Sequence, residues 1–238
     1  MVKRVNYSYI NINMNKMNYL KSIRIKNNWT QAEMANYIGV SRPTYLLYEK
    51  GDGYITVRQL SKLADRLGCE IQDILAEKIT DEEKYKEVLL ETIKNGADSD
   101  GKIAKTKLAK LIYLADFAWY YQNLEAMTGA RYRRLDQGPV PNYYFAAIDE
   151  LTEAGYLNLE IGRDCQLLSL TKAGLMRKNL KVSKDEEGLI RNIGQKWQGK
   201  RSQEIVKFTH EQLPYKICNP GEVIPYELIT QQDPENVY

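Results

Sequence analysis

The side chains that could act as catalysts are few and lie far apart in the sequence. His210 is the one histidine, and no nucleophile lies next to it. Cys69, Cys165 and Cys218 form neither a CxxC pair nor a disulfide framework, which indicates a reducing cytosol. No phosphate-binding glycine loop, metal-ligand spacing or nucleophile elbow appears. These features predict a protein that is not an enzyme and that holds no metal or cofactor.

Two charged features could instead take part in binding. Asp116 lies inside an aromatic stretch, where an aspartate more often pairs with a cation or caps a nearby loop than acts as an acid. The segment Arg131–Arg134 is basic and contains Tyr132, so it could bind an acidic partner or RNA. The alternative for this segment is a solvated loop whose arginine stems pack on the aromatic helix.

The composition predicts a folded, cytoplasmic chain of two domains. Its 238 residues are 43% apolar, which suffices for real cores. No apolar run approaches the roughly 18 residues of a membrane span, and no signal peptide opens the sequence. The net charge of +3 divides into 12 Lys+Arg against 7 Asp+Glu in residues 1–78 and 22 against 24 in residues 79–238. The first part is therefore suited to phosphate, and the second is not.

Helix signals are dense in residues 16–78 and predict five short helices. The sequence Thr30–Glu33 forms a capping box, and Gly39 ends the helix that follows. Ser41 is a good N-cap for the next helix, and Thr56–Gln59 forms a second capping box. Very short turns join these helices.

Composition also predicts the division of the chain. Residues 1–15 form an arm, either a short strand or a frayed segment, and 16–78 form the first helical domain. Residues 79–98 read as a connecting helix and linker, with the effective boundary near the polar stretch 94–102. Residues 99–238 form the second domain.

The second domain is predicted to be α-helical with one small β-hairpin. Residues 108–121 are apolar nearly all round, which predicts a helix at the centre of its domain. A loop over 129–138 leads into a helix ending at Gly155, and 156–170 alternate as a hairpin with Leu157, Leu159, Ile161, Leu167 and Leu170 on its apolar face. Further helices begin at Thr171, Ser183 and Ser202, and the last 25 residues look extended. The fold class is mainly α, with a winged-helix-like order in the second domain.

The segment Trp29–Gly51, WTQAEMANYIGVSRPTYLLYEKG, resembles the helix-turn-helix of the lambda-repressor/Cro-like (XRE) family. The resemblance implies that the helix starting at Ser41 enters the major groove of DNA and that the protein binds as a dimer. Gln31 and Ser41 would bind phosphate or buttress that helix, and Arg42 and Thr44 would reach bases or backbone. The DNA-binding residues implied by the family pattern are Gln31, Ser41, Arg42, Thr44 and Lys50.

Two leucines depart from this pattern. Leu46 and Leu47 stand where relatives usually carry polar side chains, and they could meet only a thymine methyl or a protein surface. Two interpretations of Leu46 and Leu47 therefore remain: the helix binds DNA weakly, or its exposed face makes contacts with protein. Tyr45 and Tyr48 are expected to pack in the core.

The second part resembles the Panacea domain, the SocA/GepA-like group of antitoxin domains. The resemblance rests on the order of Lys107–Phe117, Thr128-Gly129, Gly138–Pro141 and Leu170–Gly174, followed by Ser202–Tyr215. It implies an antitoxin. Antitoxins of this family neutralise toxins that are unrelated to one another, some by direct binding and at least one as an adaptor that delivers its toxin to a protease. The candidate partner-binding residues are Tyr113, Asp116, Tyr120, Arg131, Arg133, Arg134 and Pro139.

Residues 139–155 hold Asp149, Glu150 and Glu153 but no Lys or Arg, so phosphate would repel this helix. The winged-helix-like segment is therefore expected to bind protein. The sequence predicts an antitoxin that neutralises a toxin by direct binding and represses its own promoter as a homodimer. The alternatives are a phage or mobile-element regulator without a toxin partner and a proteolytic adaptor.

Overall fold

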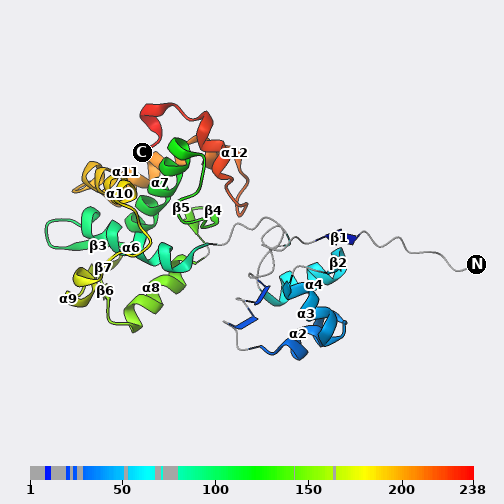
Figure 1. The fold of residues 1–238 in the computed structure, drawn as a ribbon. Helices are drawn as coiled ribbons and strands as arrows, with labels where there is room; N and C mark the ends of the chain where they lie inside the picture. Colours follow the sequence, from blue (N-terminus) through cyan, green and yellow to red (C-terminus); the bar gives the residue numbers. More distant parts are fainter. Residues whose placement is uncertain are drawn as a thin grey trace, which may run out of the picture. The chain divides into compact units, whose positions relative to one another are not determined.

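The computed structural model describes residues 9–11, 20–21, 24–25, 29–50, 53–67, 71, 80–141, 143–162 and 165–238. The chain divides into two compact units, Met1–Ile79 and Thr80–Tyr238, whose helices and strands are drawn in Figure 1. Each unit contains its own core of buried apolar side chains.

The described part of the first unit is built from short helices and a two-stranded ribbon. Its elements are β1 (Tyr9–Asn11), α2 (Gln31–Ile38), α3 (Arg42–Lys50), β2 (Tyr54–Thr56) and α4 (Val57–Leu67). Strands β1 and β2 pair antiparallel, so the strand alternative holds for this piece of the arm. The remainder of the arm, most of the expected first helix and the last short helix lie outside the described residues.

The predicted helix boundaries of this unit are confirmed by their hydrogen bonds. Thr30 and Glu33 form the reciprocal capping box of α2, and Thr56 and Gln59 form the one that precedes α4. The expected core residues Tyr45 and Tyr48 are buried. The buried apolar set of this unit is Leu20, Met34, Ala35, Ile38, Tyr45, Tyr48, Ile55, Leu60, Leu63 and Ala64.

The second unit is mainly helical. Its helices are α6 (Glu82–Gly96), α7 (Lys105–Asn123), α8 (Tyr144–Glu153), α9 (Lys172–Met176), α10 (Lys184–Trp197), α11 (Ser202–Glu211) and α12 (Leu213–Ile217), with 3-10 turns η2 (Tyr226–Gln231) and η3 (Pro234–Asn236). Its strands are β3 (Lys102–Ala104), β4 (Tyr132–Leu135), β5 (Gly138–Pro141), β6 (Leu157–Ile161) and β7 (Gln166–Leu170).

Helix α6 belongs to the second unit rather than to a linker. Asp81 caps its N-terminus, and Tyr85, Val88 and Leu89 are completely buried in the core that α6 shares with α7 and α10. The division between the units therefore falls before Thr80, not near residues 94–102 as the polar composition of that stretch suggested. That stretch contains the end of α6, the turn 97–101 and the first residue of β3.

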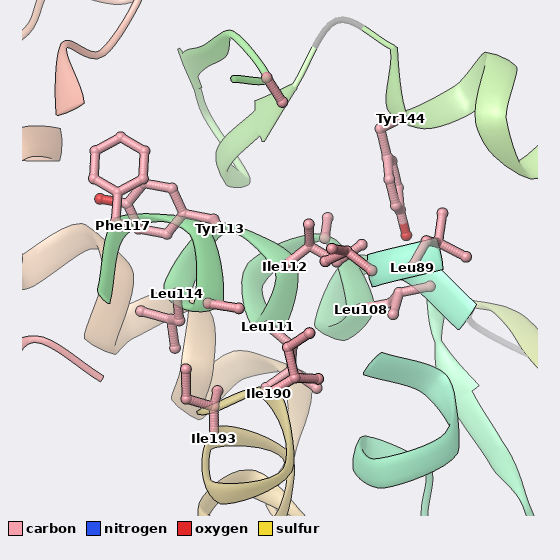
Figure 2. Close-up of a cluster of buried hydrophobic side chains, with 14 of the residues drawn as sticks. Leu89, Leu108, Leu111, Ile112, Tyr113, Leu114, Phe117, Tyr144, Ile190 and Ile193 are labelled. Carbon is pink, nitrogen blue, oxygen red and sulfur yellow. The ribbon is translucent and has the colours of Figure 1, made fainter. Parts of the chain in front are cut away.

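Helix α7 is the centre of the second unit, as its all-round apolar pattern predicted. Every side chain from Lys107 to Ala118 is buried. Figure 2 shows why no polar face is present: Leu111 points toward Ile190 and Ile193 of α10, Leu108 lies near Leu89 of α6, and the rings of Tyr113 and Phe117 lie at the other end. A helix enclosed by neighbours on all sides requires apolar residues on all sides.

The three-stranded sheet has the order β3-β7-β6, with both pairs antiparallel. Together with α6, α7 and α8 it follows the helix and strand order of a winged helix, with hairpin β4–β5 inserted between α7 and α8. The predicted hairpin is present, but its apolar face was only partly identified. Leu157 and Leu168 are buried, whereas Leu159 and Ile161 are exposed, because β6 is the edge strand and extends beyond the core.

Two irregular segments were predicted wrongly. The stretch 129–138 is not a loop: most of it belongs to the β4–β5 hairpin, in which Tyr132 pairs with Pro141. The C-terminal residues are not extended but form α12, η2 and η3, and they bury Tyr226 and Ile229 in the core. Both segments obtain their structure from contacts with α7, which local sequence does not reveal.

Two glycines of α10 allow a matched test of the packing between α6 and α10. A methyl group at Gly194 would lie 2.6 Å from the Asn95 carbonyl oxygen of α6, whereas nothing lies within 4 Å of one at Gly188. Gly194→Ala should therefore lower the free energy of unfolding of the second unit by about 1–3 kcal/mol. Gly188→Ala should raise it by about 1 kcal/mol, because alanine favours helix. Urea unfolding followed by circular dichroism measures both, and equal effects would contradict the close packing.

Candidate nucleic-acid interface and partner-binding surface

Helices α2 and α3 are joined by a tight turn that only a small set of residues permits. Gly39 adopts the left-handed conformation at φ 79°, which favours glycine. Its N–H and that of Val40 both donate to the Ala35 carbonyl, at 3.0 and 2.9 Å. Ala35 is buried, so its small side chain allows the two helices to approach, as the sequence predicted.

The N-terminus of α3 presents polar groups to solvent. Ser41 Oγ accepts the Thr44 N–H at 3.2 Å and lies 2.7 Å from Thr44 Oγ1, so Ser41 caps the helix as predicted. Ser41 and Arg42 are exposed and Thr44 is half-buried. Unpaired N–H groups and the helix dipole at such an end favour phosphate oxygens.

Gln31 connects this surface to the interior of the unit. Its Nε2 donates to Glu49 Oε2 at 2.9 Å, and its Oε1 accepts from Arg42 Nη2 at 3.3 Å. Glu49 is buried and pairs with Arg24, whose Nε lies 2.5 Å from Oε1. The hydrogen bond to Glu49 raises the pKa of Arg24. Gln31 is thus held by a buried ion pair and orients Arg42.

Sequence reasoning missed the roles of Arg24 and Glu49. Glu49 stood in the quoted family segment, but its partners are 25 and 18 residues away in sequence, and no spacing rule connects residues so distant.

The remaining positions of α3 are exposed to different degrees. Lys50 is exposed at the C-terminal end of α3. Leu46 is half-buried, and Leu47 is 45% exposed. An exposed leucine at this place is available to a thymine methyl or to a protein, so both alternatives stay open.

Asp116 is the most strongly bonded carboxylate of the second unit. It is completely buried and accepts hydrogen bonds from the Thr128 N–H at 3.1 Å, the Thr128 hydroxyl, Tyr132 Oη at 3.1 Å and Tyr226 Oη at 2.8 Å. Burial raises its pKa, and the four donors act in the opposite direction. Asp116 therefore fastens segments of the fold together, in agreement with the expected loop-capping role, and is not accessible to a partner.

Several other candidate partner-binding residues are also internal. Tyr113 and Pro139 are buried, and half-buried Tyr120 packs against Tyr226 with 5.4 Å between ring centroids. Helix α7 directs Tyr113 and Tyr120 toward the core, and Pro139 is buried on β5. They therefore stabilise the fold beneath the partner-binding surface and are not available for contact with a partner.

The arginine segment is a strand with engaged side chains, not a solvated loop. Arg134 Nε donates to the Tyr215 carbonyl at 3.0 Å, and its guanidinium lies 4.7 Å from the centroid of the Tyr215 ring. Arg133 Nη1 donates to the Gly221 carbonyl at 2.9 Å. Arg131, Arg133 and Arg134 are all half-buried. Two of the three arginines thus hold the C-terminal segment in place.

His210 packs against the same group. Its ring stacks on that of Tyr215, with centroids 4.3 Å apart and planes inclined by 7°. Burial lowers the pKa of His210, and the nearby cations Lys110 and Arg134 lower it further.

Helix α8 carries the acidic surface that the sequence predicted. Asp149 and Glu153 are exposed. Glu150 accepts from Tyr143 Oη at 2.6 Å and lies 2.9 Å from Lys86 Nζ. Helix α8 takes the place of the DNA-recognition helix of a winged helix, but its carboxylates would be repelled by phosphate.

Comparison with known proteins identifies both units. Residues 20–74 match the helix-turn-helix family, and residues 108–215 match the "Antitoxin SocA-like, Panacea domain" family. The chain belongs to the helix-turn-helix family through its first unit and carries a Panacea domain in its second. Neither family is an enzyme family.

Two curated relatives are similar to part of the chain. One "Cryptic phage CTXphi transcriptional repressor RstR", from Vibrio cholerae serotype O1, is 33% identical over 85 residues, which are 36% of this chain and 76% of that repressor. A second RstR from Vibrio cholerae is 35% identical over 68 residues, 28% of this chain and 61% of that protein. No solved structure matches the chain. The protein is a DNA-binding regulator of the helix-turn-helix type.

None of the helices in the described ranges is both long and apolar enough to cross a membrane. The buried helix α7 has 19 residues, but its apolar sequence is interrupted by four charged residues, Lys105, Lys107, Lys110 and Asp116.

The arrangement of Gln31 and Arg42 predicts how DNA binding responds to substitution. Arg42→Ala should weaken binding to the DNA upstream of the gene by about 1–3 kcal/mol, or reduce the salt slope by about one if Arg42 contacts phosphate. Gln31→Ala should cause a smaller loss, because Arg42 remains but is no longer held. Lys207→Ala is the control, since Lys207 is exposed on α11 of the second unit. Fluorescence anisotropy at several salt concentrations measures these effects, and unchanged affinity and slope for Arg42→Ala would refute the interface.

Proposed function

We propose that the protein is an antitoxin that acts in two ways. Its second unit binds and neutralises a toxin encoded beside it, and its first unit binds the shared promoter and represses transcription. The observation that carries the proposal is the fusion of a helix-turn-helix with a Panacea domain in one chain. Both actions are binding, and neither requires a catalytic group.

The acidic helix supports a protein partner for the second unit. Asp149 and Glu153 are exposed on α8, and a nucleic acid would have to approach these carboxylates. A protein surface with basic or apolar groups meets no such repulsion. The winged-helix order is thus best explained as a scaffold for protein contacts.

The first unit acts on DNA as a homodimer in this proposal. One helix-turn-helix offers only a few side chains, namely Gln31, Ser41, Arg42, Thr44 and Lys50, and two half-sites supply the missing contacts. The protein works in the cytoplasm, where its promoter DNA is found.

A second candidate function is a transcriptional regulator without a toxin partner. The similarity of part of the chain to two phage repressors favours this candidate. In that case the second unit would serve dimerisation or ligand sensing. The two candidates differ in what the product of the neighbouring reading frame does to cell growth.

Co-expression with the neighbouring reading frame tests the proposal. The neighbouring product alone should arrest growth, and the full chain should restore it. A fragment of residues 80–238 should restore growth as well, whereas residues 1–79 should not, because the neutralising surface is assigned to the second unit. Rescue by residues 1–79, or a neighbouring product that is harmless, would refute the antitoxin assignment and favour the regulator.

A further inference from the structure

Two lysines on the inner faces of α7 have contrasting environments. The side chains of Lys107 and Lys110 are almost completely buried, at 2% and 0% exposed. The Lys107 ammonium lies 3.1 Å from Asp98 Oδ1. The Lys110 ammonium donates to the Pro139 carbonyl at 3.0 Å, and no carboxylate of the described chain pairs with it. Burial lowers the pKa of Lys110 to about 7. A cation without a counter-ion is costly to bury, which is the cause of this lowered pKa, and a ligand carboxylate beside Lys110 would favour the charged ammonium again.

Lys110 belongs to the lining of a cleft of about 560 Å³ in the second unit. Lys105 and Arg134 also line this cleft, and among the lining residues that the structure describes Asp136 is the one carboxylate. The positive charge of the lining thus exceeds the negative charge. Because the surrounding protein has a low dielectric constant, the field of the buried Lys110 extends into the cleft.

The remaining walls of the cleft are largely apolar. Val140 and Tyr144 contribute, and Phe145 of α8 is 53% exposed there. The Lys105 ammonium lies 5.0 Å from the centroid of the Phe145 ring. The cleft therefore combines an apolar wall with cations, which suits a ligand that has one apolar and one acidic group.

A polar group beside Lys110 lacks a hydrogen-bond partner. His210 Nε2 is buried and has no hydrogen bond. A methyl group placed on Gly138 would lie 2.7 Å from Lys110 Cε and 3.3 Å from His210 Nε2, so the three residues are in close proximity. Lys110, with a single carbonyl partner, and His210 Nε2, with none, thus lie together next to the cleft, and a ligand carboxylate would supply the counter-ion that Lys110 lacks.

We propose that this cleft binds an acidic segment of a partner protein, in which an aspartate or glutamate stands next to an apolar side chain. The inference rests on the proposed function, since it names the chemistry by which the partner would be recognised. A single carboxylate can approach Lys105 and Arg134 while its apolar neighbour covers Phe145. A nucleic-acid backbone would place several phosphates against α8, where Asp149 and Glu153 are exposed.

Short peptides test the cleft in the full chain without any toxin. The probes are acetyl-Leu-Glu-Phe-amide and its neutral counterpart acetyl-Leu-Gln-Phe-amide, titrated into labelled protein and followed by NMR. The acidic peptide should bind at least fivefold more tightly and shift the resonances of Ala109 and Phe145, which line the cleft. Lys110→Met should reduce this preference to less than twofold.

Lys107→Met is the matched control, because it removes a buried lysine of the same helix that lies outside the cleft lining, and it should leave the preference intact. Lys105→Gln, at a half-buried position, should reduce the preference about twofold to threefold, which keeps the test independent of the folding of Lys110→Met. Equal binding of both peptides, no binding of either, or tighter binding of tetrauridylate in the same cleft would each overturn the assignment. If the acidic peptide binds but the neighbouring gene product is harmless, only the antitoxin proposal fails.

Discussion

The buried carboxylate of Asp116 joins three segments of the second unit. Asp116, inside α7, receives hydrogen bonds from Thr128, Tyr132 and Tyr226, which belong to a turn, to the inserted hairpin and to the C-terminal segment. A buried carboxylate is tolerated only when donors surround it. These three segments must therefore be in place together, and the position of each is coupled to that of the others.

The hydrogen bonds to Asp116 also help to position residues that line the cleft. Tyr132 begins strand β4, and Arg134 of that strand holds Tyr215 by a hydrogen bond and by contact with its ring. Pro139, on the paired strand β5, supplies the carbonyl that receives the Lys110 ammonium. The buried anchor thus determines where the cations of the cleft lie. The residues that the family resemblance singled out are important mostly because they build this framework from within.

Local signals allowed the helix ends and the helix-turn-helix to be predicted from the sequence. Capping pairs such as Thr30 with Glu33, and the left-handed Gly39, act within a few residues and were confirmed. The burial of α7 was equally predictable, since its apolar pattern has no polar face. The assignment to both families is also confirmed.

Features that depend on distant contacts were not predictable. The β4–β5 hairpin contains prolines and arginines and looks like a loop until α7 and the C-terminal segment enclose it. The sequence does not reveal that Lys107 pairs with Asp98 whereas Lys110 has only a carbonyl partner, because both lysines occupy similar positions in one helix. The ion pair of Arg24 with Glu49 was not predictable either, because its two residues lie far apart in the sequence.

The central claim is that the chain joins two binding activities that operate through different surfaces. One culture can report both: the full chain carrying Arg42→Ala is expressed with the neighbouring gene product under a separate inducible promoter, beside a reporter driven by the chain's own upstream DNA. Reporter output and growth are then read together. The account predicts that the reporter is derepressed while growth is still restored. Loss of growth rescue together with repression would contradict it, because neutralisation would then require the DNA-binding surface.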